Sequence, residues 1–234
     1  MIRLVEGIKK DYSIIALIIA NLVPLVGMLF WGWTLLSVLI FYWLESAVIG
    51  IFNVPKMLLA STIPKGSSLP INQRIIITII LKFFLAPFFL MHYGAFMMVH
   101  LLFIFLISSL ADSNLGTGII TNMGQAISPM VYPALFLFAS HGISFFVNFI
   151  GKEEYKKESI KNLMAAPYKR ITVMHLTLLL GGFLGVILSA STGSKSASLG
   201  IISFFIILKI YFDIKAHNKE HSETFIKLPL QKGK

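Results

Sequence analysis

The chain contains six apolar runs of about 20 residues, each long enough to cross the hydrocarbon core of a bilayer as an α-helix. The runs cover approximately residues 12–30, 33–59, 82–108, 129–150, 171–190 and 197–216. Of all 234 residues, 56% are hydrophobic and 13% are charged, whereas soluble domains usually carry about 25% charged residues. The sequence therefore predicts an all-α, polytopic membrane protein, with residues 1–234 forming a single transmembrane domain built as a six-helix bundle.

The connections between the early runs are unusual. Only Trp31-Gly32-Trp33 separates the first two runs, which predicts an antiparallel helical hairpin. The third apolar stretch already starts at Ile71, and as one helix up to residue 107 it would be about 55 Å long, too long for one crossing. Because Arg74 and Lys82 lie near its start, we expect residues 71–82 to form an interfacial helix, with a kink at Pro87 before or within the crossing.

The basic residues predict the orientation of the bundle. Of the 20 Lys and Arg residues, 19 fall in the N-terminal segment, the 2–3 segment, the link 152–170 or the C-terminal end, and the remaining one is Lys195. With six spans all four groups lie on one side, so the positive-inside rule places both termini in the cytoplasm and the protein in the cytoplasmic membrane. We interpret the link 152–170 as an amphipathic cytoplasmic segment that touches anionic headgroups.

The composition also excludes several function classes. The chain has no cysteine, which excludes disulfides, thiolate zinc sites and iron–sulfur clusters. The formal net charge of +10 is explained by the topology signal. We therefore expect membrane lipids as partners, with a small amphiphile or an ion as a further ligand and no nucleic acid.

Three ionisable residues are expected near the membrane midplane. Glu45, His92 and His141 each lie about 10 to 12 residues from a helix end, which corresponds to the middle of a span at 1.5 Å per residue. Because an ionisable group at this depth costs at least about 2.5 kcal/mol, each is a candidate functional residue. A carboxylate and two imidazoles at one depth predict a shared polar site.

A second layer is expected about 10 Å nearer the cytoplasm. His175 lies about five residues into the fifth run, and Asp213 and His217 lie near the cytoplasmic end of the sixth. His100 lies further outward, and we expect it to bond a neighbouring helix. Simpler interpretations stay open for two of these residues, because Asp213 has Lys209 as an i, i+4 ion-pair partner and His217, like His221, lies near the water interface.

Imidazole and carboxylate are the ligands that zinc, iron and manganese use in proteins when thiolates are absent. The predicted pool of metal ligands is Glu45, His92, His141, His175, Asp213 and His217. One hypothesis is a metal-dependent intramembrane hydrolase. A second is a proton- or ion-coupled transporter that uses Glu45 and the histidines as a relay. A third is a bis-histidine haem protein, pairing His92 with His141 or His175 with His217. Whether the chain is an enzyme stays open.

Several segments together carry a resemblance to a known family. They are Tyr42-Trp43-Leu44-Glu45-Ser46 with Phe52-Asn53, Phe88-Phe89-Leu90-Met91-His92-Tyr93-Gly94, His141-Gly142-Ile143-Ser144-Phe145, Pro167-Tyr168-Lys169-Arg170-Ile171 and Lys209-Ile210-Tyr211-Phe212-Asp213. With them the chain resembles an uncharacterised prokaryotic family of multi-pass membrane proteins, a domain of unknown function. The resemblance runs from the second span to the sixth. It implies a membrane location and supplies no activity, cofactor or catalytic residue.

Overall fold

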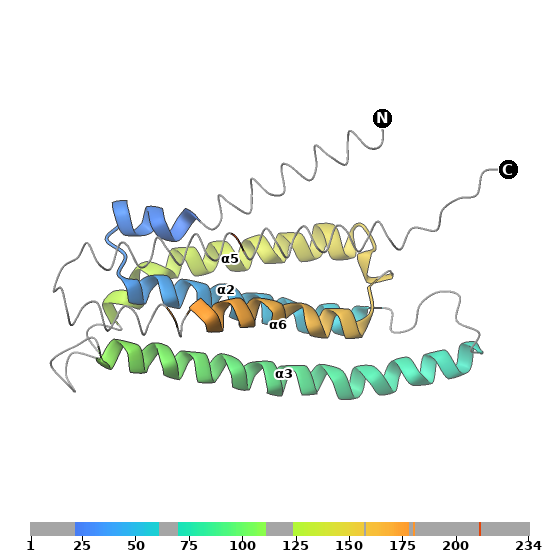
Figure 1. Ribbon diagram of the computed structural model, residues 1–234. Helices are drawn as coiled ribbons and strands as arrows, with labels where there is room; N and C mark the ends of the chain where they lie inside the picture. The colour runs from blue at the N-terminus through green and yellow to red at the C-terminus, as the bar shows by residue number, and fades with distance from the viewer. Residues whose placement is uncertain are drawn as a thin grey trace.

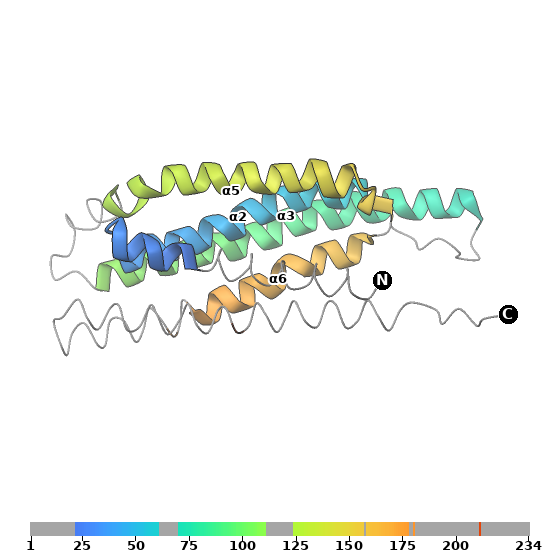
Figure 2. The same ribbon diagram turned by 90° about the horizontal axis from the view of Figure 1, so that it is seen from above.

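The structure, a computed structural model, describes residues 22–60, 70–110, 124–156 and 158–177, together with Leu180 and Tyr211. The elements are α2 (Leu35–Leu59), α3 (Ile71–Leu110), the 3₁₀ turn Ser128–Met130, α5 (Val131–Ser144), the π-helix Phe145–Ile150, the 3₁₀ turn Glu154–Lys156 and α6 (Ile160–Thr177); residues 22–30 and 124–127 are helical as well. Figures 1 and 2 show long helices lying side by side. The predicted all-α fold class is confirmed for the described residues, which contain no strand.

A tight link joins the helical residues 22–30 to α2. Gly32 adopts the left-handed conformation (φ +66°) that favours glycine, and the Trp33 amide donates to the Gly27 carbonyl at 3.0 Å. A Cβ added at Gly27 would lie 2.3 Å from the Trp33 ring, so the ring can pack here only against a glycine. Thr34 and Ser37 then cap α2 reciprocally, with each backbone amide donating to the other's hydroxyl. The predicted hairpin is confirmed, with residues 22–30 folding back over the start of α2 (Figure 1).

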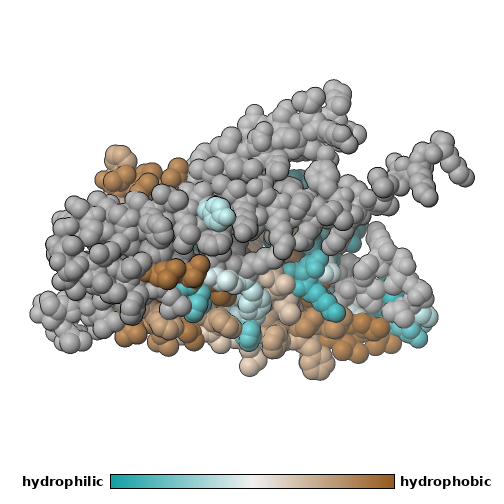
Figure 3. Space-filling model, in the orientation of Figure 1, coloured by the Kyte–Doolittle hydropathy of each residue, from teal (hydrophilic) through white to brown (hydrophobic). Residues whose placement is uncertain are grey.

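Helix α2 is central among the described elements, because it packs against α3, α5 and α6. Over its most apolar stretch 56% of the residues are buried, compared with 11% for α3 and 11% for the helix Gly124–Ile150. Figure 3 shows the consequence for α3, whose outward side chains form a brown, hydrophobic lower edge of the molecule. An outer surface of this kind is expected where a helix faces lipid.

Three described helices are long and apolar enough to cross a membrane. They are Leu36–Leu59, Ile71–Leu106 and Gly124–Ile150, and they overlap the predicted spans 33–59, 82–108 and 129–150. The predicted span 197–216, apart from Tyr211, and the greater parts of 12–30 and 171–190 lie outside the described residues.

Helix α3 is continuous over 40 residues, with Pro87 inside it. At 1.5 Å per residue its length is about 60 Å. Residues 71–82, expected as a separate interfacial helix, continue directly into the part that follows, and the ribbon curves gently along its length (Figure 1). Their position along the membrane interface stays a prediction.

The link between the fourth and fifth spans differs from the sequence prediction. Residues 152–170 were expected to form an amphipathic cytoplasmic link before the fifth span, whereas α6 already begins at Ile160. The buried residues Ile160, Leu163, Pro167 and Ile171 recur every three or four positions and hold one side of α6 against the bundle. The fifth helix therefore starts about 11 residues earlier than predicted, which moves every later residue of this helix about 17 Å further along it.

Candidate functional site

Helices α3 and α6 lie side by side and run in the same direction, and their contact carries two pairs of polar rings (Figures 1 and 2). His92 Nδ1 lies 2.8 Å from the Tyr168 hydroxyl. His175 Nδ1 lies 2.8 Å from His100 Nε2. The members of each helix are separated by about two turns, so the two pairs lie about 12 Å apart along the contact. We call this contact the histidine seam, defined by His92, His100, Tyr168 and His175.

The His100–His175 pair has a defined direction of hydrogen bonding. His100 Nδ1 lies 2.6 Å from the Phe96 carbonyl oxygen of its own helix, and a carbonyl only accepts, so this nitrogen carries a proton. In the neutral pair, His100 Nε2 is therefore the acceptor and His175 Nδ1–H is the donor. His100 is fully buried, and the two rings meet edge to face with centroids 4.8 Å apart. The arrangement is a closed, polar contact between two imidazoles.

The His92–Tyr168 pair is more open and more aromatic. The His92 ring stacks on Phe88, with centroids 5.2 Å apart, and the residue is exposed. The Tyr168 ring packs edge-on against Phe89 and Tyr93, so it fills the angle between α3 and α6. These rings orient the hydroxyl towards His92 Nδ1.

Hydrogen bonds between α2 and the helices α3 and α6 fix the register of the seam. The Asn53 side-chain amide donates to the Leu163 carbonyl of α6 at 2.9 Å, and the Trp43 indole donates to the Met97 carbonyl of α3 at 2.8 Å. Tyr93 donates its hydroxyl proton to the Ser46 carbonyl at 2.7 Å. Because each bond joins two helices, the three contacts determine which residues of α3 and α6 face each other.

His100 and His175 revise the predicted layers. The expectation that His100 bonds a neighbouring helix is confirmed. The expectation that His175 belongs to a layer nearer the cytoplasm is wrong, because α6 starts at Ile160 and brings His175 level with His100, two turns beyond His92.

The predicted metal ligands are not brought together within the described residues. Glu45 lies on α2, His92 on α3 beside Tyr168 of α6, and His141 on α5, and the described part of the chain has no group of three or more His, Asp or Glu side chains placed to hold a metal ion. Asp213 and His217 lie outside the described residues. The six-residue ligand set and the haem pairings that depend on it therefore stay predictions.

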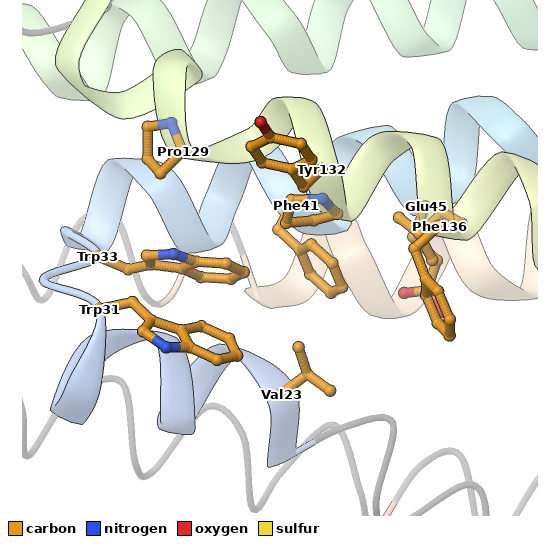
Figure 4. A pocket seen from close by; sticks show the side chains of 10 residues that line it. Val23, Trp31, Trp33, Phe41, Glu45, Pro129, Tyr132 and Phe136 are labelled. Atoms are coloured by element: carbon orange, nitrogen blue, oxygen red, sulfur yellow. The ribbon is translucent and has the colours of Figure 1, made fainter.

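Glu45 instead belongs to the wall of a cavity of about 630 Å³ between residues 22–30, α2 and α5 (Figure 4). The lining residues are Val23, Trp31, Trp33, Phe41, Glu45, Pro129, Tyr132, Pro133, Phe136 and Leu137. Trp33 and Phe41 are buried and form the inner wall, whereas Trp31, Tyr132 and Phe136 are exposed and form the outer wall. We call this space the aromatic cavity.

Sequence reasoning missed Tyr168 and the aromatic cavity, and it did not pair His100 with His175. A signal for that pair was available, because Ile160, Leu163, Pro167, Ile171 and His175 are spaced as one stripe of a helix. That stripe places His175 on the same side of α6 as the buried residues. The cavity has no comparable signal, since its aromatic residues come from three separate segments.

Comparison with known proteins adds a family. The sequence model of a family of unknown function, DUF6498, matches residues 6–225. No curated protein and no solved structure matches the chain. The resemblance to a domain of unknown function is thereby confirmed, and the prokaryotic origin that it implied stays a prediction.

Proposed function

This chain belongs to DUF6498, a family of unknown function, and we propose that it is a multi-pass membrane protein whose His100–His175 pair takes up and releases a proton during proton-coupled transport. The observation that carries the proposal is the hydrogen bond of 2.8 Å between the two imidazoles, one of them fully buried. Intramembrane ionisable residues that face the protein interior and pair with one another are typical of proton pathways.

The geometry of the pair suits the uptake of one proton. When His175 gains a proton at Nε2, its Nδ1–H and the lone pair of His100 Nε2 share the positive charge across one charge-assisted hydrogen bond. A second proton would place two imidazolium rings in contact, which like-charge repulsion opposes. Loss of the Nε2 proton from His175 restores the neutral pair. The pair therefore binds and releases a single proton without breaking the contact between α3 and α6.

The proposal includes six spans with both termini in the cytoplasm. The three described helices that could cross a membrane support it. A further support comes from the described basic residues Lys56, Arg74 and Lys152, which belong to the end of α2, the start of α3 and the link after the π-helix. These three segments lie at one end of the bundle, at the right of Figure 1. A cytoplasmic location of that end agrees with the positive-inside rule.

Proton flux into liposomes tests the proposal. Purified protein is reconstituted with a pH-sensitive dye inside the vesicles, and a potassium diffusion potential drives proton entry. We expect His100→Gln and His175→Gln each to lower the protein-dependent flux by at least about tenfold, because glutamine bonds but does not titrate in this range. The matched control is Thr172→Val, on the exposed side of the same helix, whose hydroxyl bonds the Tyr168 carbonyl of its own helix.

Two results would contradict the proposal. One is a wild-type flux no greater than that of empty liposomes at any driving potential. The other is full flux in both glutamine variants. Thermal unfolding of each variant in detergent separates a lost proton site from a lost fold, and only variants that unfold cooperatively near the wild-type temperature enter the comparison.

A metal-dependent hydrolase acting on a lipid or small amphiphile is the second candidate. The Phe96 carbonyl holds the His100 Nδ1 proton, and His100 Nε2 would become available to a metal ion only if its hydrogen bond with His175 Nδ1 were broken. Elemental analysis of purified protein decides between the two candidates. About one equivalent of zinc, iron or manganese, lost in His100→Ala and His175→Ala, would favour the hydrolase.

A further inference from the structure

The aromatic cavity has a wall chemistry that differs from that of the rest of the described bundle. Trp31 and Trp33 stand with ring centroids 6.0 Å apart, and Trp33 lies 5.6 Å from Phe41. Tyr132 and Phe136 of α5 line the same space (Figure 4). Glu45 is the one acidic residue among the described residues that line the space. Five aromatic rings and one carboxylate therefore surround a common volume.

We infer that the aromatic cavity is a binding site for a hydrophobic organic cation, such as a quaternary ammonium or phosphonium compound. Aromatic faces attract cations through their ring quadrupole, and the attraction is larger where water is excluded. The Glu45 carboxylate in the same wall supplies a negative charge that complements the charge of the cation. Apolar substituents on the cation would occupy the space between the rings.

The size and position of the cavity agree with this class of ligand. A volume of about 630 Å³ lies within the range of about 300 to 1,000 Å³ that is typical of small-molecule sites. The exposed outer wall of Trp31, Tyr132 and Phe136 lies on the surface of the described bundle. A hydrophobic cation dissolved in the bilayer would meet this wall directly.

The cavity and the histidine seam are separate observations. The cavity is formed by residues 22–30, α2 and α5, whereas the seam is formed by α3 and α6. The binding site therefore does not rest on the proposed proton uptake, and a failure of either leaves the other standing.

Ligand binding is measured with tetraphenylphosphonium as the probe. Two of the three tryptophans, Trp31 and Trp33, line the cavity and report binding through their fluorescence. We expect saturable quenching of the full-length protein in nanodiscs. Tetraphenylborate has nearly the same size and the opposite charge, and we expect it to bind at least about tenfold more weakly, a factor that corresponds to about 1.4 kcal/mol.

Substitutions test whether tetraphenylphosphonium binds in the aromatic cavity. Glu45→Gln removes the charge and keeps the side-chain size, so the affinity for tetraphenylphosphonium should fall at least about tenfold. The matched control is Glu154→Gln, an exposed carboxylate in the link before α6, for which we expect unchanged affinity. Phe136→Leu, at an exposed position of the outer wall, should weaken binding by a smaller factor and does not depend on how Glu45→Gln folds.

The inference is overturned by any of three results. They are quenching without saturation, equal affinity for tetraphenylborate, and unchanged affinity in Glu45→Gln and Phe136→Leu together. Proton flux is not read in this assay, so its outcome is independent of the test of the His100–His175 pair.

Discussion

The histidine seam and the aromatic cavity lie on different sides of α2. They differ in what surrounds their polar side chains. In the seam, imidazole and phenol groups of α3 and α6 bond one another directly, at 2.8 Å in both pairs. In the cavity, aromatic carbon surrounds a single described carboxylate and leaves a volume of about 630 Å³. A closed polar contact suits the exchange of a proton, whereas an open apolar volume with one charge suits a ligand. The difference distinguishes the proposed proton site from the proposed ligand site.

The largest expected effect comes from moving α2, the helix that lines the aromatic cavity and packs against both helices of the histidine seam. A Cβ added at Gly50 would lie 2.4 Å from the Tyr93 ring, a distance that side chains do not tolerate. Gly50→Val should therefore push α2 away from α3, break the bond from Tyr93 to the Ser46 carbonyl, and cost about 1–3 kcal/mol or more of unfolding free energy. Thermal unfolding in detergent measures the loss.

Gly94→Ala is the control for this change. It lies one residue from Tyr93 on α3 and has nothing within 4 Å of the added methyl group, so its stability should equal or slightly exceed that of wild type. Equal stability of Gly50→Val and Gly94→Ala would contradict the close approach of α2 and α3, and with it the register of the seam.

The second prediction concerns the energetic coupling within the histidine seam and between the seam and the aromatic cavity. In a double-mutant cycle of His100→Ala and His175→Ala, each of which removes the hydrogen bond, we expect a coupling energy of about 0.6 to 1.7 kcal/mol, the range found for hydrogen bonds between membrane helices. In the cycle of His100→Gln with Glu45→Gln we expect additivity within about 0.5 kcal/mol, since the two residues belong to different contacts. Strong coupling in the second cycle would join the two regions into one site.

The sequence predicted correctly those features of the fold that depend on a single helix or link. Runs of apolar residues located α2, α3 and the helix Gly124–Ile150, because the length of a span is a local property. The tight hairpin followed from the short link around Gly32 for the same reason. The start of α6 was missed because Lys161, Lys169 and Arg170 made the segment look like a loop. The apolar stripe that packs it against the bundle has a period of 3.6, which an average over the segment hides.

The candidate site was harder to predict, because it depends on which helices are neighbours. Glu45, His92 and His141 share a depth in the sequence, yet they project from three helices towards different surroundings. The depth of a residue in a span can be estimated by counting residues from the helix end. The rotation of a helix about its axis, and the helices that it contacts, depend on tertiary contacts such as the hydrogen bond from Asn53 to α6. An error of 11 residues in one helix start was sufficient to separate His175 from His100.

The third effect compares two tyrosines, one in each region. Tyr168→Phe removes the hydrogen bond to His92 and should cost about 0.6 kcal/mol, the average for such bonds in membrane proteins. Tyr132→Phe changes a side chain that is 82% exposed at the outer wall of the cavity, and its stability should stay within the error of measurement. Chemical unfolding of both variants in the same detergent gives the difference. Equal costs would show that the His92–Tyr168 contact adds no stability to the seam.

The smallest expected effect concerns the link between the π-helix Phe145–Ile150 and α6. The hydrogen bond from Lys156 to the Glu153 carboxylate holds the pKa of the Lys156 ammonium above its ordinary value. Because the raised pKa favours the cation in the folded state, the contribution to stability is complete below the ordinary lysine pKa of about 10.4 and disappears as the pH rises through the raised value.

Glu153→Gln should therefore lower Tm slightly at neutral pH, and the gap to wild type should close above about pH 10.5 or in about 1 M salt. Glu153 has a positive φ of 55°, and glutamine meets the same backbone cost, so the exchange isolates the charge. Both side chains are largely exposed, which keeps the effect below that of Tyr168→Phe. A gap that persists at high pH and high salt would mean that Glu153 holds α5 and α6 together through something other than this ion pair.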